Sequence, residues 1–288
     1  MSDTSVASRA DFGAGDIERT LGAIAEGIGA GRLVPFLGPG VLSMDGAEPC
    51  IPVTPEAIAS ELHKKVPAPG RIRTNMWGVA QFIEQRRHRK TLIALMAQIF
   101  KTPVAPNALH QKLAALPIPL VVDTWYDGAM RTALAARGDW VEIQGISRAL
   151  ENSDIWLKAY DPAGEQVTVE ATHAARTILY KPHGAVTPAR NFLVADSDYV
   201  EVLTEIDIQT PIPDAVKLIR ETSGFVFLGC RFHDQMLRTY ARQIIKRSKG
   251  PHYVLVDVEG LTRNETKFFE EIGATVVTAK VGELEKKL

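Results

Sequence analysis

The sequence predicts an α/β protein in which a parallel β-sheet is covered by helices on both faces. Short apolar runs alternate with segments of helical periodicity along most of the chain, as in proteins whose parallel strands are connected by helices. Of the 288 residues, 45% are hydrophobic and 23% are charged, which is typical of a soluble globular protein. A chain of this length can bury a core without disulfides or structural metal.

The N-terminal part begins with residues 1–15, which we expect to form a flexible tail, and continues with apolar residues at helical spacing from Asp16. Residues 32–37 (RLVPFL) predict a buried parallel strand that breaks at Gly38-Pro39-Gly40. Pro35 argues against a central position for this strand, because proline cannot donate a hydrogen bond to a neighbouring strand.

The next part of the chain is predicted to be helical. Thr54 as N-cap and Pro55 in the first turn mark the start of one helix. Residues 75–100 and 106–116 have the periodicity of further helices.

Strands and helices alternate again in the second half. Residues 139–172 interrupt the alternation and are predicted to form a small antiparallel excursion. The expected strands are 118–123, 177–181, 225–228, 252–258 and 274–278, and the expected helices are 214–221, 234–248 and 263–272.

Charge and cysteine content exclude several classes of protein. The formal net charge is −1, so no overall positive field attracts nucleic acid or anionic lipid, and the basic run 86–90 is interpreted as a solvated helix end. Cys50 and Cys230 have no CxxC partner, which argues against a disulfide framework and a zinc site. The N-terminal residues lack a signal-peptide pattern, and no stretch of about 18 apolar residues occurs. We therefore expect a cytoplasmic protein with no membrane or nucleic-acid partner.

Two short segments after predicted strands carry candidate ligand-binding residues, because open parallel sheets bind ligands at the carboxyl ends of their strands. In Gly38-Pro39-Gly40 the glycines would let backbone N–H groups approach a pyrophosphate, although such a turn is often only structural. In residues 123–127 (DTWYD) an acidic side chain could bind a ribose hydroxyl, although capping of the following helix is the commoner role.

Two further segments follow later strands. His183 in residues 180–184 (YKPHG) is a candidate general base, although most single histidines are structural. In residues 229–234 (GCRFHD), Gly229 would admit a cofactor close to the backbone, and Asp234 could cap the next helix.

Taken in order, these segments resemble the motifs of the SIR2-like (sirtuin-like) domain family, particularly its bacterial branch without the zinc module. The resemblance covers about residues 32–240. It also includes residues 196–200 (DSDYV), which are similar to the family's acidic-Tyr helix start. Against the family's GAGxS, Ile/Leu-Pro, TNYD, KxHG and GYSxxD patterns, this chain has Gly38-Pro39-Gly40, Ile51-Pro52, Thr124-Trp125-Tyr126-Asp127, Lys181-Pro182-His183-Gly184 and residues 229–234.

The resemblance implies a Rossmann-like NAD site, a mostly helical insert at about residues 41–115, no metal, and a homo-oligomer or protein partner. Gly38 and Gly40 would face the diphosphate. His183 would act as general base toward a ribose hydroxyl, Asp127 would support the nicotinamide-ribose side, and Gly229 would border the adenosine half. The remaining implied NAD contacts are Pro39, Pro52, Thr124, Trp125, Cys230 and Asp234.

The sequence departs from the family pattern at several of these positions. Trp125 replaces the catalytic Asn, and an indole cannot supply the amide that orients water or ribose hydroxyls. Pro39 removes a backbone donor, and Leu42 occupies the place of a small polar residue, with Ser43 displaced by one. The zinc-binding cysteines of the deacylases are absent, so protein deacylation is the least supported activity.

These departures lead to three hypotheses. The first is a protein that binds NAD or ADP-ribose with catalysis weakened or lost through Trp125. The second is an NAD glycohydrolase that uses His183 as general base. The third is a structural or interaction protein that has lost the ligand.

Overall fold

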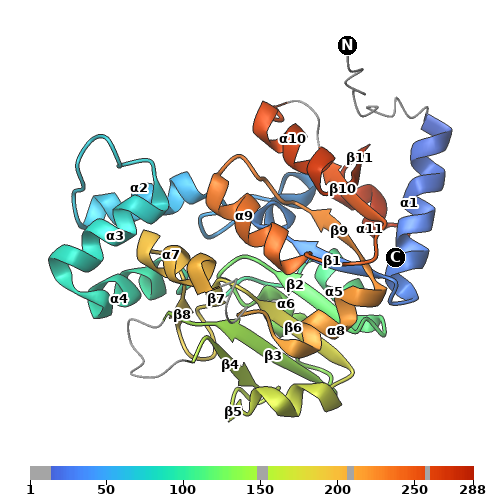
Figure 1. The fold of residues 1–288 in the computed structure, drawn as a ribbon, viewed down its shortest axis with the longest axis horizontal. Helices are drawn as coiled ribbons and strands as arrows, with labels where there is room; N and C mark the ends of the chain where they lie inside the picture. The colour runs from blue at the N-terminus through green and yellow to red at the C-terminus, as the bar shows by residue number, and fades with distance from the viewer. Residues whose placement is uncertain (1–13, 148–154, 206–210, 257–259) are drawn as a thin grey trace.

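A computed structural model describes residues 14–147, 155–205, 211–256 and 260–288, and every structural statement below concerns these residues. They form a sheet in the order β11-β10-β9-β1-β2-β6-β3-β4-β5 (Figure 1), in which β11 to β3 are parallel and β4 and β5 are antiparallel. The strands are β1 (Leu33–Leu37), β2 (Leu120–Asp123), β3 (Trp140–Gly145), β4 (Leu157–Tyr160), β5 (Gln166–Val167), β6 (Thr177–Lys181), β9 (Gly224–Leu228), β10 (His252–Val256) and β11 (Ala274–Thr278).

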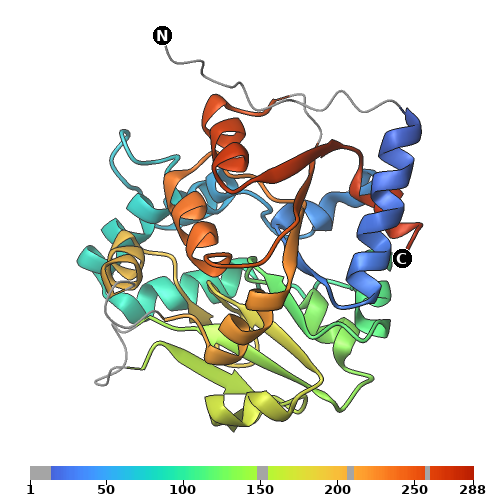
Figure 2. The same ribbon diagram turned by 45° about the vertical axis from the view of Figure 1, so that its right-hand side comes forward.

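Helices cover both faces of this sheet, which confirms the predicted α/β fold (Figures 1 and 2). The alternation within β1 shows the two faces, since Leu33 and Leu37 belong to one core cluster and Val34 and Phe36 to the other. The first face carries α1 (Ala14–Gly29), α5 (Ala108–Ala115), α6 (Ala129–Leu134) and α11 (Val281–Glu285), and the second carries α8 (Asp214–Thr222), α9 (Gln235–Ile244) and α10 (Arg263–Glu271).

A helical unit lies beside the sheet and is formed mainly by the segment inserted between β1 and β2. It contains α2 (Pro55–Lys65), α3 (Met76–Arg87) and α4 (Arg89–Ile99), and α7 (Asp196–Glu205) packs against α3. A 3-10 helix, η1 (Pro39–Gly46), connects β1 to this unit. The expected insert ran to residue 115, but α5 packs on α6 and α11 and therefore belongs to the layer that covers the sheet.

The single helix expected over residues 75–100 is two helices. His88 adopts a left-handed backbone conformation, with φ of 69°, and ends α3 immediately before α4 begins. Apolar periodicity continues across this break, so the pattern alone does not reveal it.

The interpretation of the basic run 86–90 as a solvated helix end is wrong for Arg89. Its side chain is buried, and Nη1 lies 2.8 Å from Asp198 on α7 and 3.0 Å from Glu84 on α3. The ion pairs join three helices of the unit, and removing one partner of a buried pair typically costs about 3–5 kcal/mol.

Pro35 lies in a central strand after all, because β1 is flanked by β9 and β2. The N–H of Gly38 donates to the carbonyl oxygen of Leu228 in β9. Because N–H groups alternate in direction along a strand, the nitrogen of Pro35 faces β2. Pairing with β2 begins only at Phe36, opposite Val122. Pro35, which lacks an N–H donor, therefore lies just before the residues that pair with β2.

The segment 139–172 extends the main sheet. β4 and β5 are antiparallel, as expected for an excursion, but β3 pairs in parallel with β6. A further 3-10 helix, η3 (Val169–Ala174), follows β5, and the short strands β7 (Gly184–Ala185) and β8 (Asn191–Phe192) form a separate pair.

Two expectations extend past the described residues. α1 already begins at Ala14, inside the expected tail, and the rest of that tail lies outside the described part of the chain. Positions 257 and 258 of the expected strand 252–258 also lie outside it. Within the described ranges, none of the helices combines the length and apolarity needed to cross a bilayer.

Candidate functional site

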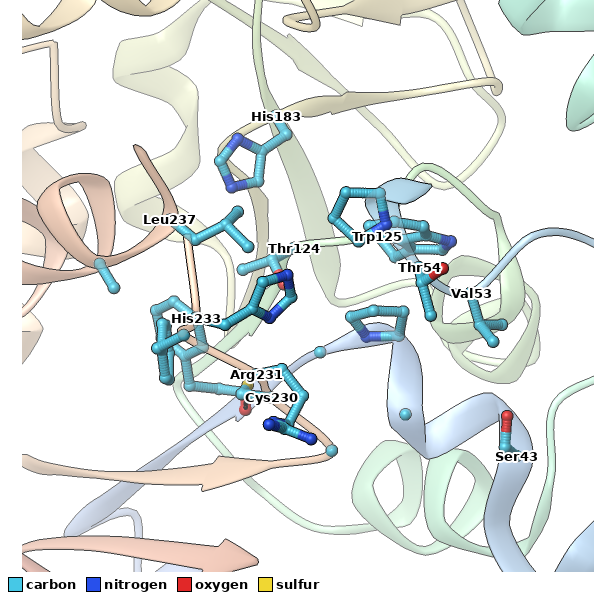
Figure 3. A pocket seen from close by; sticks show the side chains of 18 of the residues that line it. Ser43, Val53, Thr54, Thr124, Trp125, His183, Cys230, Arg231, His233 and Leu237 are labelled. Carbon is cyan, nitrogen blue, oxygen red and sulfur yellow. Dashed lines mark hydrogen bonds between the residues drawn. The ribbon is translucent and has the colours of Figure 1, made fainter. Parts of the chain in front are cut away.

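A pocket of about 250 Å³ lies at the carboxyl ends of the central strands (Figure 3). The chain leaves β1 toward β2 on one side and later returns to pair β9 on the other, which is the kind of switch point where open α/β sheets bind ligands. Eight of the sequence-predicted residues line this pocket: Gly38, Pro39, Gly40, Thr124, Trp125, His183, Gly229 and Cys230.

The glycines after β1 and β9 are required because the two turns pack backbone to backbone. A Cβ atom on Gly38 or Gly40 would lie 2.5 Å or 2.7 Å from the carbonyl oxygen of Gly229. Gly229 itself has φ of +63°, and a Cβ there would lie 2.4 Å from the backbone nitrogen of Val41. These glycines are therefore needed for the contact between the two turns, whether or not a ligand is bound.

The same packing occupies the backbone N–H groups that were expected to face a diphosphate. The N–H groups of Gly38 and Gly40 donate to carbonyl oxygens at the end of β9, each at 2.9 Å. The N–H of Val41 donates to Gly38 at 3.2 Å, and Pro39 has no N–H. The turn thus lines the pocket without offering a free N–H group at residues 38–41.

His183 reaches the pocket from the end of β6, and its ring points into the cavity in Figure 3. Its Nδ1 lies 2.8 Å from the hydroxyl of Tyr199 on α7, which orients the ring and leaves Nε2 on the pocket side. Burial, followed by the nearby positive charge of Lys181, lowers the pKa of His183 to about 3. The imidazole is therefore neutral near pH 7 and is a weak base.

Trp125 presents an apolar surface to the pocket. Only 4% of the residue is exposed, and its indole Nε1 donates to the carbonyl oxygen of Pro52 at 2.8 Å. The ring packs against Tyr126 and against Phe100, the residue that follows α4. This hydrogen bond holds the helical unit against the sheet, and it occupies the one polar atom that this side chain possesses.

Three sequence-predicted residues do not line the pocket. Asp127 is buried and accepts a hydrogen bond from the N–H of Ala129 at 2.8 Å, so it caps the start of α6. Asp234 caps α9 by accepting from Met236 at 2.7 Å. Pro52 contributes the carbonyl that holds Trp125.

Several lining residues were not singled out from the sequence. Leu237, Ala241 and Ile244 recur at helical spacing on α9 and form one wall of the pocket. The periodicity indicates an amphipathic helix, but not which strand ends that helix covers. Where the pocket meets α2, the Nε2 of His233 lies 3.1 Å from Oε1 of Glu56, which joins segments 177 residues apart.

A second cavity of about 750 Å³ continues along the same edge of the sheet, past β9 to the ends of β10 and β11. It shares Gly40, Ser43, Gly229, Cys230 and Arg231 with the first pocket. Burial raises the pKa of Cys230 well above its ordinary value, so its thiol stays protonated.

Arg231 and Glu265 hold the turn after β9 against α10. Glu265 is fully buried and accepts from the Nε of Arg231 at 2.8 Å and from the N–H of Phe232 at 2.9 Å. Burial alone would raise the pKa of Glu265, but hydrogen bonds from Arg231, Thr262 and Phe232 outweigh it and lower the pKa to about 2. The ion pair therefore persists across ordinary pH.

No group of three or more His, Cys, Asp or Glu side chains is arranged to hold a metal ion among the residues that the structure describes.

Comparison with known proteins identifies one family. A family model described as "SIR2-like domain" matches residues 119–277, which is more than half of the chain and runs from β2 to β11. No curated protein matches this sequence.

Proposed function

Since this chain belongs to the SIR2-like domain family, which is NAD-related, we propose that it is a nucleotide-binding protein that recognises NAD or ADP-ribose and has weakened or lost catalysis. The observation that carries the proposal is the pair of adjoining cavities along the carboxyl edge of the sheet. The first is smaller than the range of about 300–1,000 Å³ typical of ligand pockets, so a dinucleotide has to extend into the second.

In this proposal, each half of the ligand lies in one cavity. His183, Thr124 and Trp125 line the first cavity, where the nicotinamide ribose would lie. Gly40, Gly229 and Arg231 border both cavities, where a diphosphate would pass. The ends of β10 and β11 line the second, where the adenosine half would lie.

Two features support weak catalysis. The indole nitrogen of Trp125 is bonded to Pro52, so position 125 offers no group that could orient an attacking water. His183 has a pKa of about 3, far below the pH at which a general base is most effective in the cell. Together, the occupied indole nitrogen and the low basicity of His183 favour ligand binding over catalysis.

The alternative is an NAD glycohydrolase that uses His183 as general base. One observation favours it: the hydrogen bond between Nδ1 of His183 and the hydroxyl of Tyr199 fixes the histidine ring with its other nitrogen on the pocket side. A hydroxyl of the nicotinamide ribose would be the group that this nitrogen contacts.

Isothermal titration calorimetry with NAD and, in parallel, ADP-ribose tests the proposal. We expect saturable binding of both ligands and little or no release of nicotinamide from NAD. Release that disappears in His183→Ala would replace the binding role by the glycohydrolase. Absence of heat with both ligands would favour a scaffold that has lost its ligand.

A second variant tests the assignment of the weak catalysis to Trp125. Trp125→Asn restores an amide at this position, so an otherwise inactive protein should gain nicotinamide release. Trp125→Leu removes the same indole without adding a polar group and serves as the control. Equal rates for these two variants would contradict the assignment.

Cytoplasmic location and assembly into a homo-oligomer remain part of this proposal. Light scattering coupled to size-exclusion chromatography measures the molecular mass in solution. A mass of 31.5 kDa would correspond to the monomer and would contradict the homo-oligomer.

A further inference from the structure

We propose that Arg231 is the residue that recognises the diphosphate of the nucleotide, in place of the glycine turn after β1. The inference rests on the proposed function, because it concerns how the same site holds its ligand. The observations that carry it are the occupied backbone donors of the turn, the position of Arg231 between the cavities, and the way its guanidinium is held.

The glycine turn cannot serve as the main phosphate cradle in this structure. The N–H groups of Gly38, Gly40 and Val41 donate to carbonyl oxygens, and Pro39 has none. A phosphate would have to displace these bonds, and each replaced bond leaves a carbonyl without its donor. The N–H groups of residues 38–41 are therefore not available to an anion, and a side-chain donor beside this turn can take their place.

Arg231 lies where those donors are needed. Five residues line both cavities, and Arg231 is the only charged residue among them. Ser43 adds a hydroxyl at the same junction, whereas the thiol of Cys230 donates to the carbonyl of Phe36 at 3.3 Å. Figure 3 shows the guanidinium of Arg231 on the side of the pocket where the β1 and β9 turns meet.

The guanidinium is held in place before a ligand arrives. Nε lies 2.8 Å from Oε1 of Glu265, and Nη2 lies 3.0 Å from Oε2 of Glu265 and 2.7 Å from the carbonyl of Gly260. These bonds use one edge of the planar group, so Nη1 on the other edge is the donor left for an anion within the described part of the chain. Half of the side chain, 49%, remains exposed, so a ligand can reach it.

Glu265 also determines the kind of recognition. Its carboxylate offsets much of the positive charge of Arg231, so attraction at a distance is weak and direct hydrogen bonds to phosphate oxygens supply the affinity. A lysine keeps the charge but cannot hold both Glu265 and a phosphate with one planar group. The pair therefore acts as a rigid donor and not as a general positive patch.

Calorimetry with ADP-ribose and adenosine tests this inference, since adenosine lacks the diphosphate. Arg231→Gln should weaken binding of ADP-ribose about 10- to 100-fold and leave binding of adenosine unchanged, because bonds to charged groups typically contribute about 1.5–3 kcal/mol. Arg231→Lys should recover only part of the loss.

Arg242→Gln is the matched control. Arg242 also pairs with a glutamate of α10, Glu271, and its side chain is 43% exposed, but it lines neither cavity. The Arg242→Gln variant should bind ADP-ribose with the affinity of the wild type. Thermal denaturation of each variant checks that it is folded.

Three outcomes overturn the inference. Equal ADP-ribose affinity in Arg231→Gln and the wild type would do so and would leave the proposed function intact. Wild-type protein that binds ADP-ribose no more tightly than adenosine would do so without any variant. Wild-type protein that binds neither NAD nor ADP-ribose would overturn the proposed function and this inference together.

Discussion

Replacing Gly229 by alanine tests whether the turns after β1 and β9 depend on direct backbone contact. Gly229 has φ of +63°, and a Cβ atom would lie 2.4 Å from the nitrogen of Val41 and 2.7 Å from the carbonyl carbon of Gly40. Both neighbours are backbone atoms of the adjoining turn, so neither can rotate away. The substitution therefore adds a steric clash to the cost of a left-handed alanine.

Gly273 provides a control that separates the two costs. It has nearly the same backbone angle, with φ of +64°, but a Cβ there would meet no described atom within 4 Å beyond its chain neighbours. Gly273→Ala should lower the free energy of unfolding by about 1–2 kcal/mol, the cost of the left-handed conformation alone. Gly229→Ala should lower it by a further 1–3 kcal/mol, roughly, because the turns must separate.

Urea denaturation followed by circular dichroism measures both free energies of unfolding. Calorimetry with ADP-ribose should also show weaker binding by Gly229→Ala, since this turn borders both cavities. If the two variants differ by less than about 0.5 kcal/mol, the contact between the turns does not constrain position 229 and the reasoning is wrong.

Three other substitutions test the remaining contacts of the site. Trp125→Phe removes the donor to Pro52 and should lower the free energy of unfolding by about 1–3 kcal/mol in urea titrations; an unchanged value would refute a role for this bond. His183 has its pKa lowered to about 3 by burial, so its contribution to stability is complete above pH 6.5 and falls as the pH drops toward 3. Between pH 6.5 and pH 5, the free energy of unfolding of His183→Gln should therefore fall by about 2 kcal/mol less than that of the wild type. Parallel plots of this free energy against pH would contradict the reasoning. Glu265 has its pKa lowered to about 2, so its contribution is complete above pH 4.5 and is lost below; Glu265→Gln should be less stable at pH 7 than the wild type, and equal melting temperatures would refute the pairing with Arg231.

Patterns within short segments determined where the candidate site lies. Apolar runs that end in glycine or in polar residues identify β1, β2, β6 and β9, and parallel strands bring their carboxyl ends to one edge. For this reason Gly38, Thr124, His183 and Gly229, which are far apart in the sequence, could be assigned to one pocket, and all four line it.

Local patterns also have a limit, which the helical unit illustrates. Periodicity predicts helices over residues 75–100, but the break at His88 depends on one backbone angle. The burial of Arg89 depends on Asp198, which lies 109 residues later. Neither a single angle nor a distant ion pair leaves a signal in apolar spacing.

By itself, the sequence determined the α/β fold, its family resemblance and the strand ends that carry the site. Only the tertiary structure decided which polar groups of that site are available to a ligand. In the folded chain the N–H groups of Gly38 and Gly40 are bonded within the turns, Trp125 is bonded to Pro52, and Arg231 is bonded to Glu265. The physical reason is that fold class follows from periodicity within one segment, whereas the availability of a donor depends on which distant segment packs against it.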